Sequence, residues 1–234
     1  MIVNSNFVFI HLHKSAGTFF TNFIRNFFPG SFLVGYHFPK LMVPAEFRHL
    51  PVLGFVRNPW DFYVSWYSFQ MQKQGSNPLF MVVSKDKKLG FKNTMERLLS
   101  LCEDPRLLNE VTQRLPNQFT KSGLNVPSSV LASIYGSQLG LYGFLYRWMY
   151  EGTAGLPVIV KKEELIPGLV SFFQEVHVSM SKEMLDYLSQ QVHANTSSHQ
   201  HYASYYDDQT AEKVLLADQT IIQQHGYRFE NSGS

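Results

Sequence analysis

The stretch that decides the fold is Phe9–Phe20, with the sequence FIHLHKSAGTFF. Its apolar start is interrupted by Lys-Ser-Ala-Gly-Thr at 14–18, after which paired phenylalanines recur at helical spacing. Small residues beside a lysine, between a strand and a helix, are typical of a loop that holds a phosphate. The usual phosphate loop has its lysine after the last glycine, as G-K-[ST]. Here Lys14 precedes Gly17, so the sequence predicts an anion-binding loop of a different kind.

Apolar runs and helical spacings alternate along the rest of the chain. Buried-strand patterns occupy Val8–Leu12, Phe32–Tyr36, Val52–Val56 and Val158–Val160. Helical patterns occupy Thr18–Phe28, a segment beginning at Pro59 with Asn58 as its cap, Leu165–Val176 and Lys182–Gln191. A last helix is predicted to begin at Asp207 or Asp208, to end at Gly226 and to point Val214, Leu215, Ala217, Ile221 and Ile222 inward. Strands separated by helices predict an α/β fold with a central parallel sheet covered on both faces.

The length of 234 residues predicts a single domain over 1–234. Within it, residues 76–152 change to short helical patterns separated by Pro and Gly, which indicates a helical insertion or lid. Residues 230–234 read as a loose tail.

Composition limits the classes of function. Twenty Lys and Arg against eighteen Asp and Glu give a net charge of +2, which does not favour a general nucleic-acid binder and implies that any anion site is local. Cys102 is the single cysteine, so no intrachain disulfide forms, and we interpret it as a small buried hydrophobe. No apolar run approaches the roughly 20 residues of a membrane span. We therefore expect a cytoplasmic protein with no integral membrane segment and no nucleic-acid partner.

The first candidate site is the turn after the first predicted strand. The backbone N–H groups of Ser15 to Thr18 are expected at a helix N-terminus, where unpaired donors and the helix dipole favour an anion. Gly17 permits close approach of the backbone, and Lys14 adds a mobile charge. The alternative is an ordinary strand-to-helix turn with a surface lysine.

The second candidate site follows the Val52–Val56 strand. Arg57 comes directly after this strand, and Ser65 comes eight residues later, two helical turns into the next helix. Both are expected at the carboxyl edge of the sheet, where open α/β folds bind ligands, and a guanidinium grips phosphate through two nitrogens. Alternatively, Arg57 is a structural ion-pair residue and Ser65 a small packing residue.

Together these motifs resemble those of a known family. HLHKSAGTFF (11–20) resembles the 5′-phosphosulfate loop of PAPS-dependent sulfotransferases, and VLGFVRNPWDFYVSWY (52–67) resembles their 3′-phosphate-binding segment. The likeness is closer to the carbohydrate O-sulfotransferase branch, because GYHFPKL (35–41) lies where that branch often has a Gly-His segment. The segment beginning HANTSSHQHY (193–202) looks like the C-terminal part of its bacterial members.

The resemblance implies a fold, an activity and a set of site residues. The implied fold is a P-loop-NTPase-like three-layer sandwich with a helical insertion. The implied reaction transfers a sulfuryl group from PAPS, without a metal, to a hydroxyl group of a carbohydrate or glycoconjugate acceptor. By this resemblance, Lys14 would bind the bridging and sulfuryl oxygens of PAPS. The 5′-phosphosulfate would be bound by Ser15, Ala16, Gly17, Thr18 and Phe19, and the 3′-phosphate by Arg57 and Ser65. Further contacts with the cofactor would come from Ser197, His199 and Tyr202.

A base is needed to take the proton of the acceptor hydroxyl. Among nine histidines, His37 matches the family's histidine, although a tyrosine intervenes in GYH. His11 and His13 flank the loop and are the alternative bases. A metal site at these two histidines lacks a complementary Cys or carboxylate cluster. Glu163 and Glu164 follow a strand and are interpreted as a surface pair.

Two other functions stay open from the sequence. One is a catalytically inactive nucleotide-bisphosphate-binding module of the same fold. The other is a kinase, which the absent G-K-[ST] loop disfavours. The high aromatic content, 15%, is also compatible with a homodimer.

Overall fold

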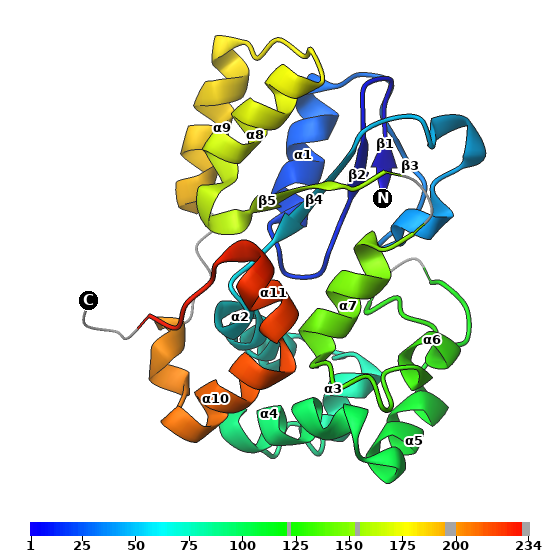
Figure 1. The fold of residues 1–234 in the computed structure, drawn as a ribbon, viewed down its shortest axis with the longest axis vertical. Helices are drawn as coiled ribbons and strands as arrows, with labels where there is room; N and C mark the ends of the chain where they lie inside the picture. The colour runs from blue at the N-terminus through cyan, green and yellow to red at the C-terminus, as the bar shows by residue number, and fades with distance from the viewer. Residues whose placement is uncertain (121–122, 153–154, 195–199, 231–234) are drawn as a thin grey trace. The chain divides into compact units, whose positions relative to one another are not determined.

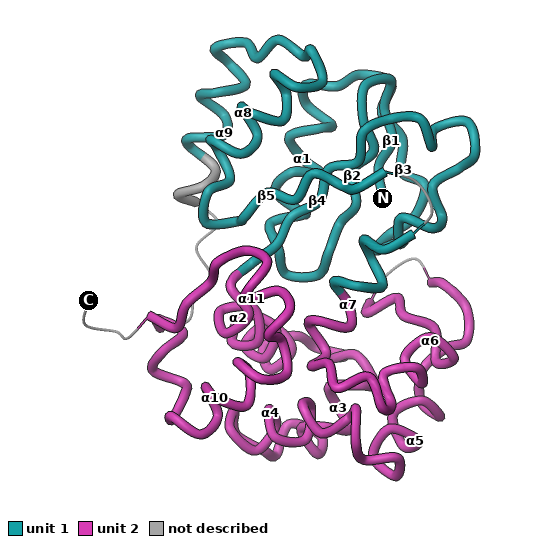
Figure 2. The backbone as a smooth tube through the Cα atoms, viewed as in Figure 1, with its two compact units in different colours: residues 1–57, 146–198 teal, residues 58–145, 199–234 magenta. Residues whose placement is uncertain are grey.

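The computed structural model describes residues 1–234 except 121–122, 153–154, 195–199 and 231–234 (Figure 1). The chain forms two compact units, which are described separately (Figure 2). Unit 1 comprises residues 1–57 and 146–198, and unit 2 comprises residues 58–145 and 199–234. The prediction of one domain over 1–234 stays a prediction, since two compact units can belong to one domain. In the described part of the chain, no helix has the length and apolar character that crossing a bilayer requires.

Unit 1 contains a five-stranded mixed sheet with the strand order β3-β1-β2-β4-β5. The strands are β1 (Ile2–Val3), β2 (Val8–Ile10), β3 (Phe32–Leu33), β4 (Val52–Val56) and β5 (Val158–Lys161). Strands β2, β4 and β5 are parallel, whereas β1 is antiparallel to both β2 and β3. The α/β class and the four predicted strands are confirmed.

The predicted central parallel sheet is present in β2, β4 and β5, but the whole sheet is mixed, because β1 was not recognised. Only the residues from Asn4 to Phe7 connect β1 to β2, and so short a link can join only antiparallel strands. The Asn4 side chain closes this turn by accepting hydrogen bonds from the backbone of Asn6 (2.7 Å) and Phe7 (3.0 Å). The sequence MIVNSNFVFI is therefore a hairpin rather than a lead into a single strand.

Three helices of unit 1 enclose a phenylalanine-rich core. They are α1 (Gly17–Phe27), α8 (Leu165–Glu175) and α9 (Lys182–Ala194), and they match the predicted helices to within a few residues. Figure 1 shows α8 and α9 in yellow beside α1 in blue. Short 3₁₀ helices η1 (Lys40–Met42), η2 (Ala45–Phe47) and η4 (Lys162–Glu164) occur in the connections.

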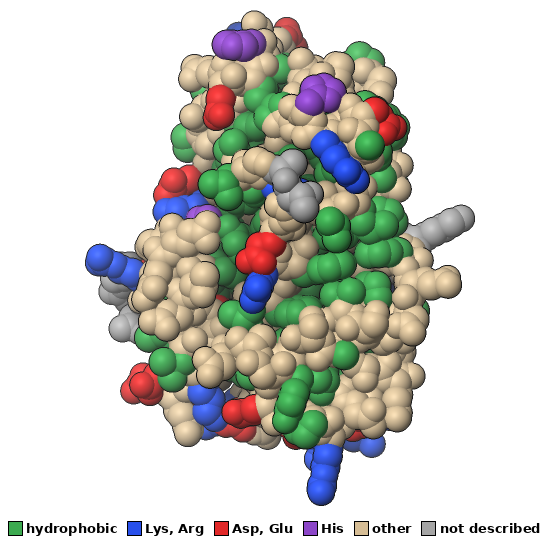
Figure 3. All heavy atoms as spheres, turned by 45° about the vertical axis from the view of Figure 1, so that its right-hand side comes forward, with side chains coloured by type: hydrophobic (Ala, Val, Ile, Leu, Met, Phe, Trp, Pro, Cys, Tyr) green, Lys and Arg blue, Asp and Glu red, His purple; other side chains and the backbone are tan. Residues whose placement is uncertain are grey.

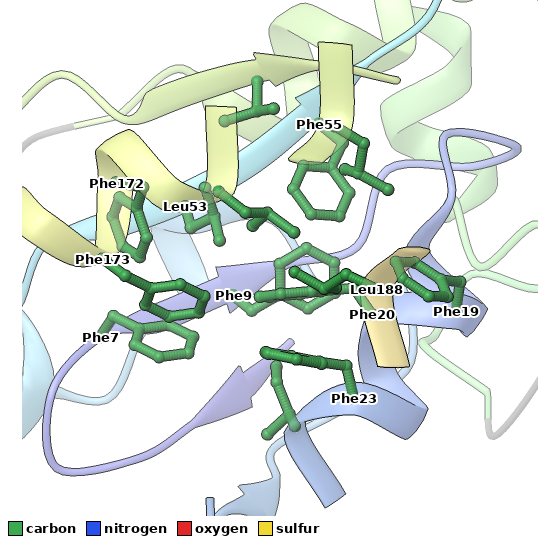
Figure 4. Close-up of a cluster of buried hydrophobic side chains, with 14 of the residues drawn as sticks. Phe7, Phe9, Phe19, Phe20, Phe23, Leu53, Phe55, Phe172, Phe173 and Leu188 are labelled. Carbon is green, nitrogen blue, oxygen red and sulfur yellow. The ribbon is translucent and has the colours of Figure 1, made fainter. Parts of the chain in front are cut away.

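The core joins the sheet to these helices (Figure 4). Phe9 of β2 lies edge-on to Phe20 of α1, with ring centroids 4.8 Å apart, and Phe55 of β4 meets the same ring at 5.0 Å. Buried aromatic rings of this kind supply large apolar area and favour such T-shaped contacts. The packing thus fixes the start of α1 relative to the ends of β2 and β4.

Tyr150 contacts β4 at the point where its neighbour β2 has ended. Strand β2 ends at Ile10, which pairs with Gly54 of β4. At the next residue, the Tyr150 hydroxyl accepts a hydrogen bond from Phe55 N (2.9 Å) and donates one to Phe55 O (2.8 Å). A Cβ at Gly54 would lie 2.3 Å from the Tyr150 ring, so glycine there leaves room for the tyrosine. Tyr150 thus replaces a missing strand partner.

Unit 2 is helical in its described residues. Its elements are α2 (Pro59–Gln72), α3 (Pro78–Val83), α4 (Phe91–Leu99), η3 (Ser100–Cys102), α5 (Pro105–Arg114), α6 (Ser128–Ala132), the start of α7 (Leu141–Tyr150), η5 (Tyr202–Tyr205), α10 (Asp208–Ala217) and α11 (Gln219–His225). Asn58 caps α2 as predicted, because its side chain accepts from Trp60 N at 3.0 Å. The helical character predicted for residues 76–152 is confirmed.

The predicted last helix is broken into α10 and α11 at Asp218, which has a separate role. Asp218 is fully buried, and its Oδ1 accepts from Gly143 N (2.7 Å) in the first turn of α7. The Tyr63 hydroxyl accepts from Tyr142 N (3.2 Å) in the same turn. These two side chains therefore cap α7 from other parts of the unit.

Burial raises the pKa of Asp218 to about 7. Glycines 140 and 143 leave space for its carboxyl group, since a Cβ on either would approach an Asp218 oxygen to 2.9 Å. The predicted inward direction of Leu215 is wrong, because Leu215 is exposed in α10 while its neighbour Val214 is the buried residue of that turn.

Replacing Tyr150 with phenylalanine is expected to lower the free energy of unfolding by about 1–3 kcal/mol, since Phe55 N and Phe55 O then lose their partner while they stay buried. Urea unfolding measures this change. Tyr135→Phe is the matched control, because Tyr135 is 55% exposed and should change stability by less than about 0.5 kcal/mol. Equal effects of the two substitutions would refute the role given to Tyr150.

Candidate anion-binding site

The three parallel strands of unit 1 are each followed by a cation. Lys14 follows β2, Arg57 follows β4 and Lys162 follows β5. Because these strands are adjacent and parallel, their carboxyl ends lie at the same edge of the sheet. The structure thus brings Lys14 and Arg57 to the same edge of the sheet, as predicted. It also places Lys162, which was not predicted, at this edge.

The loop between β2 and α1 leaves backbone donors available. Ala16 is the N-cap of α1, has φ 60° and makes no side-chain capping bond. The first helical hydrogen bond runs from Phe20 N to Ala16 O at 3.1 Å. The N–H groups of Gly17, Thr18 and Phe19 therefore have no acceptor within the helix. The first turn carries no acidic residue, so the positive end of the helix dipole is not neutralised there.

Gly17 is required by its contact with His11. A Cβ at Gly17 would lie 1.8 Å from His11 Cδ2, so the imidazole lies directly against the glycine. The glycine therefore serves two purposes, since it lets a ligand approach the backbone and lets a histidine side chain occupy the space beneath the loop.

Lys14 and Arg57 are linked through the backbone. Arg57 Nη1 donates a hydrogen bond to Lys14 O at 3.1 Å, and Lys14 has the left-handed φ of 55°. Burial, together with the nearby charges of Arg57 and Lys162, lowers the pKa of Lys14 to about 8. A bound anion would relieve the repulsion among these cations, so the electrostatics favour a negatively charged ligand.

Three buried histidines form a stack beside the loop. The rings of His13 and His37 are nearly parallel, with centroids 3.7 Å apart and an interplanar angle of 16°. His11 also contacts His37, with ring centroids 4.5 Å apart and the two rings tilted by 55°. His37 has φ 54°, a strained conformation for a residue with a Cβ. The described residues contain no group of three or more His, Cys, Asp or Glu that could hold a metal ion.

The hydrogen bond of His37 selects its tautomer. His37 Nδ1 lies 2.6 Å from His11 O, and a carbonyl only accepts, so Nδ1 carries the proton. Burial lowers the pKa of His37 well below 6.5, and the charges of His13 and His11 act in the same direction. The ring is therefore neutral at pH 7, and Nε2 holds the lone pair that can accept a proton.

His11 is also neutral. Burial lowers its pKa to about 3, assisted by the charges of the N-terminal ammonium and His13. Because the His11 ring is packed against Gly17 and its carbonyl accepts from His37, His11 positions the stack.

The other loop residues differ in which of their groups a ligand can reach. Ser15 is buried and donates through Oγ to His13 O at 3.2 Å. Thr18 is exposed, so its hydroxyl is accessible to a ligand. The Phe19 side chain is in the core, where it stacks on Tyr187. Phe19 therefore offers only its backbone N–H at this site.

The remaining predicted cofactor contacts belong to unit 2 or fall outside the described residues. Ser65 is buried within α2 and belongs to unit 2, whereas Arg57 is the last residue of the first segment of unit 1. Tyr202, also in unit 2, is buried, and its hydroxyl accepts from Glu230 N at 2.8 Å. Ser197 and His199 lie outside the described residues. The structure thus describes the first anion site, while the assignment of these four residues stays a prediction.

Lys162 was missed by the sequence reasoning. The signal was present in VIVKKEEL (158–165), where a cation comes directly after a predicted strand, as at Arg57. Glu163 and Glu164 are exposed, as the interpretation of a surface pair requires, and Glu164 pairs with Lys161 at 3.3 Å.

Acid is expected to destabilise unit 1 through His11 and His37. Their folded pKa values lie below the ordinary 6.5, so the unfolded state binds more protons below pH 6.5. The stability that these two residues contribute is complete above pH 6.5 and is lost as the pH falls toward 3. The free energy of unfolding is therefore expected to be lower at pH 5 than at pH 7. Urea unfolding at pH 7 and pH 5 measures the loss.

His37→Asn is the matched variant for this measurement. Asparagine keeps a donor for His11 O, tolerates a positive φ and does not titrate. The variant should therefore lose less stability than the wild type between the two pH values, because position 37 no longer titrates. An equal loss in both proteins would show that His37 is not held neutral by burial.

Comparison with known proteins does not give this site a family. No protein-family model, no curated protein and no solved structure matches the chain. The chemistry of the site must therefore be argued from its own residues.

Proposed function

We propose that the protein is a PAPS-dependent O-sulfotransferase. The observation that carries this proposal is the combination, at one edge of the sheet, of Lys14, Arg57 and a neutral His37 whose Nε2 is unprotonated. PAPS has a sulfuryl group on a 5′-phosphate and a separate 3′-phosphate, so it requires two places of positive charge. The cations after β2 and β4 support such a pair.

The start of α1 is assigned to the 5′-phosphosulfate. The N–H groups of Gly17, Thr18 and Phe19 have no acceptor within the helix, and the helix dipole adds to their attraction for an anion. Lys14 stands before the glycine, at the end of the strand, and would follow the charge that develops on the oxygen between sulfur and phosphorus. Arg57 and Ser65 are assigned to the 3′-phosphate by the resemblance.

The reaction is an in-line transfer. The acceptor hydroxyl oxygen attacks sulfur, the bond between sulfur and the 5′-phosphate oxygen breaks, and adenosine 3′,5′-bisphosphate leaves. His37 Nε2 takes the hydroxyl proton, while Nδ1–H stays bonded to His11 O. The bound donor is an anion, so it would raise the lowered pKa of His37 and make Nε2 a better base. Lys14 stabilises the leaving phosphate, and the protein otherwise acts by positioning.

Three finer assignments belong to the same proposal. The parallel strands β2, β4 and β5, with the loop before α1, support a P-loop-like three-layer arrangement. The glycan or glycoconjugate acceptor rests on the resemblance to the carbohydrate branch. The cytoplasmic location rests on the single cysteine.

Replacing Lys14 with methionine should weaken the binding of adenosine 3′,5′-bisphosphate by about 10- to 100-fold, the usual loss of a charge-assisted hydrogen bond. Calorimetric titration measures the binding. Lys182→Met is the matched control, because Lys182 is an exposed lysine of the same unit and should leave the affinity unchanged. Similar losses in the two variants would indicate only a general effect of charge.

Arg57→Gln tests the second anion position. The wild type should prefer adenosine 3′,5′-bisphosphate to 5′-AMP, and this variant should lose that preference while it keeps its affinity for 5′-AMP. The preference between the two nucleotides is informative because partial unfolding of the variant would weaken the binding of both nucleotides alike. Equal binding of both nucleotides by the wild type, or tighter binding of ATP, would contradict the assignment.

His37→Asn should reduce turnover at least 100-fold and leave the affinity for adenosine 3′,5′-bisphosphate within about twofold, since general base catalysis is worth about 10²- to 10⁴-fold. Sulfuryl transfer from PAPS to a panel of glycans and simpler hydroxyl compounds measures turnover. Unchanged turnover would move the role of base to His11 or His13. Selective bisphosphate binding by a wild type that transfers to no acceptor would favour the inactive binding module.

A further inference from the structure

Unit 1 contains a pocket of about 420 Å³ that the proposed reaction does not use. The segment from Lys40 to Val52 forms most of its wall, and Gly155 and Leu156 close the other side. Its volume lies in the range of pockets that hold small organic ligands. The pocket is therefore large enough to hold a small organic ligand separate from the ligand of the anion site.

The pocket is at the opposite end of β4 from the anion site. Val52, which begins β4, lines it, whereas Arg57 follows the end of the strand. With a rise of about 3.3 Å per residue, the two positions are on the order of 16 Å apart along the strand. No residue from Lys14 to Phe19, nor His37 or Arg57, lines the pocket.

A lysine whose side chain is mostly buried lies in the wall. Lys40 is only 7% exposed, although lysines are seldom buried without a partner of opposite charge. Its Nζ donates to the Gly155 carbonyl, which can satisfy only one of three N–H groups. Desolvation lowers the pKa of Lys40, with no carboxylate among the described residues to oppose it. An anion in the pocket would supply the missing charge.

The lining combines positive charge with apolar surface. Arg48 is exposed and adds a second cation, and no Asp or Glu is among the described lining residues. Most of the other lining residues are apolar. Leu156 is 98% exposed and Leu41 is 55% exposed, so large apolar side chains at the pocket stay in water. On the face that Figure 3 draws, hydrophobic side chains gather at the surface with cationic and acidic ones among them.

We propose that this pocket binds a small organic carboxylate with an apolar chain, holding the acid group at Lys40 and Arg48 and covering Leu41 and Leu156 with the chain. An ionised carboxylate matches the uncompensated cations, and its chain removes exposed leucine surface from water. A neutral lipid would leave Lys40 without a counter-charge, and an inorganic anion would leave the leucines exposed. The inference does not depend on the proposed transfer reaction.

Calorimetric titration with decanoate, below the concentration at which it forms micelles, tests the proposal. Decanol and acetate are the matched probes, because each has one half of the proposed ligand. The wild type should bind decanoate at least tenfold more tightly than either. Decanol binding as tightly as decanoate, acetate binding as tightly as decanoate, or no decanoate binding at millimolar concentration would each overturn the proposal.

Two exposed residues provide variants that should not disturb folding. Arg48→Gln removes a cation, and Leu156→Glu introduces a carboxylate that repels the ligand. Each should weaken decanoate binding at least tenfold. Lys40→Met should weaken it further, with thermal unfolding as a check of folding, while Lys182→Met should have no effect. Unchanged binding in both Arg48→Gln and Leu156→Glu would place the ligand elsewhere.

The same titrations separate this pocket from the anion site. Lys14→Met should bind decanoate as the wild type does, and saturating adenosine 3′,5′-bisphosphate should not displace it. Displacement by the bisphosphate would show that decanoate occupies the anion site, and would refute a second pocket. Failure of bisphosphate binding with normal decanoate binding would instead refute only the proposed function.

Discussion

Parallel backbone pairing of β2 with β4, and of β4 with β5, holds three strand ends side by side. Lys14, Arg57 and Lys162 follow these three strand ends, so the hydrogen-bond register of the sheet determines where the positive charge of these residues gathers. The register depends in turn on the core, because Phe9, Phe20 and Phe55 lock β2, α1 and β4 together. The site is thus a product of packing on one face of the sheet.

This arrangement stores free energy at the site. Lys14, Ala16 and His37 all have positive φ, which costs roughly 1–2 kcal/mol for each residue with a Cβ. His11 and His37 are buried, which disfavours their protonated forms, and Lys14 lies among other cations. Such strain persists only where the surrounding structure holds it, and here the phenylalanine core does so. A bound anion would recover part of this cost.

The elements that sequence could predict are those with local signals. The periodicity of Phe19, Phe20 and Phe23 identified α1, and the Asn58-Pro59 pair identified the start of α2. The hairpin of β1 with β2 was missed because Ile2–Val3 is too short to have a period, and its turn depends on one asparagine side chain.

The site shows the same division between local and long-range information. Lys14, Gly17 and Arg57 follow strands whose patterns are visible, so their neighbourhood could be inferred. The stacking of His13 on His37 could not, since it joins residues 24 positions apart through a strained backbone. The break at Asp218 was equally hidden, because the carboxyl group caps a helix 75 residues earlier in the chain. Long-range capping of this kind leaves no pattern in the segment that supplies it.

The contact between His11 and Gly17 has a consequence for how this sequence can vary. The imidazole fills the volume that any side chain at position 17 would need. A larger residue at 17 is therefore compatible only with a smaller one at 11, and the loss of His11 would open a void under the loop. Homologues that keep this loop should consequently show the two positions changing together, so that the pair behaves as one inherited unit.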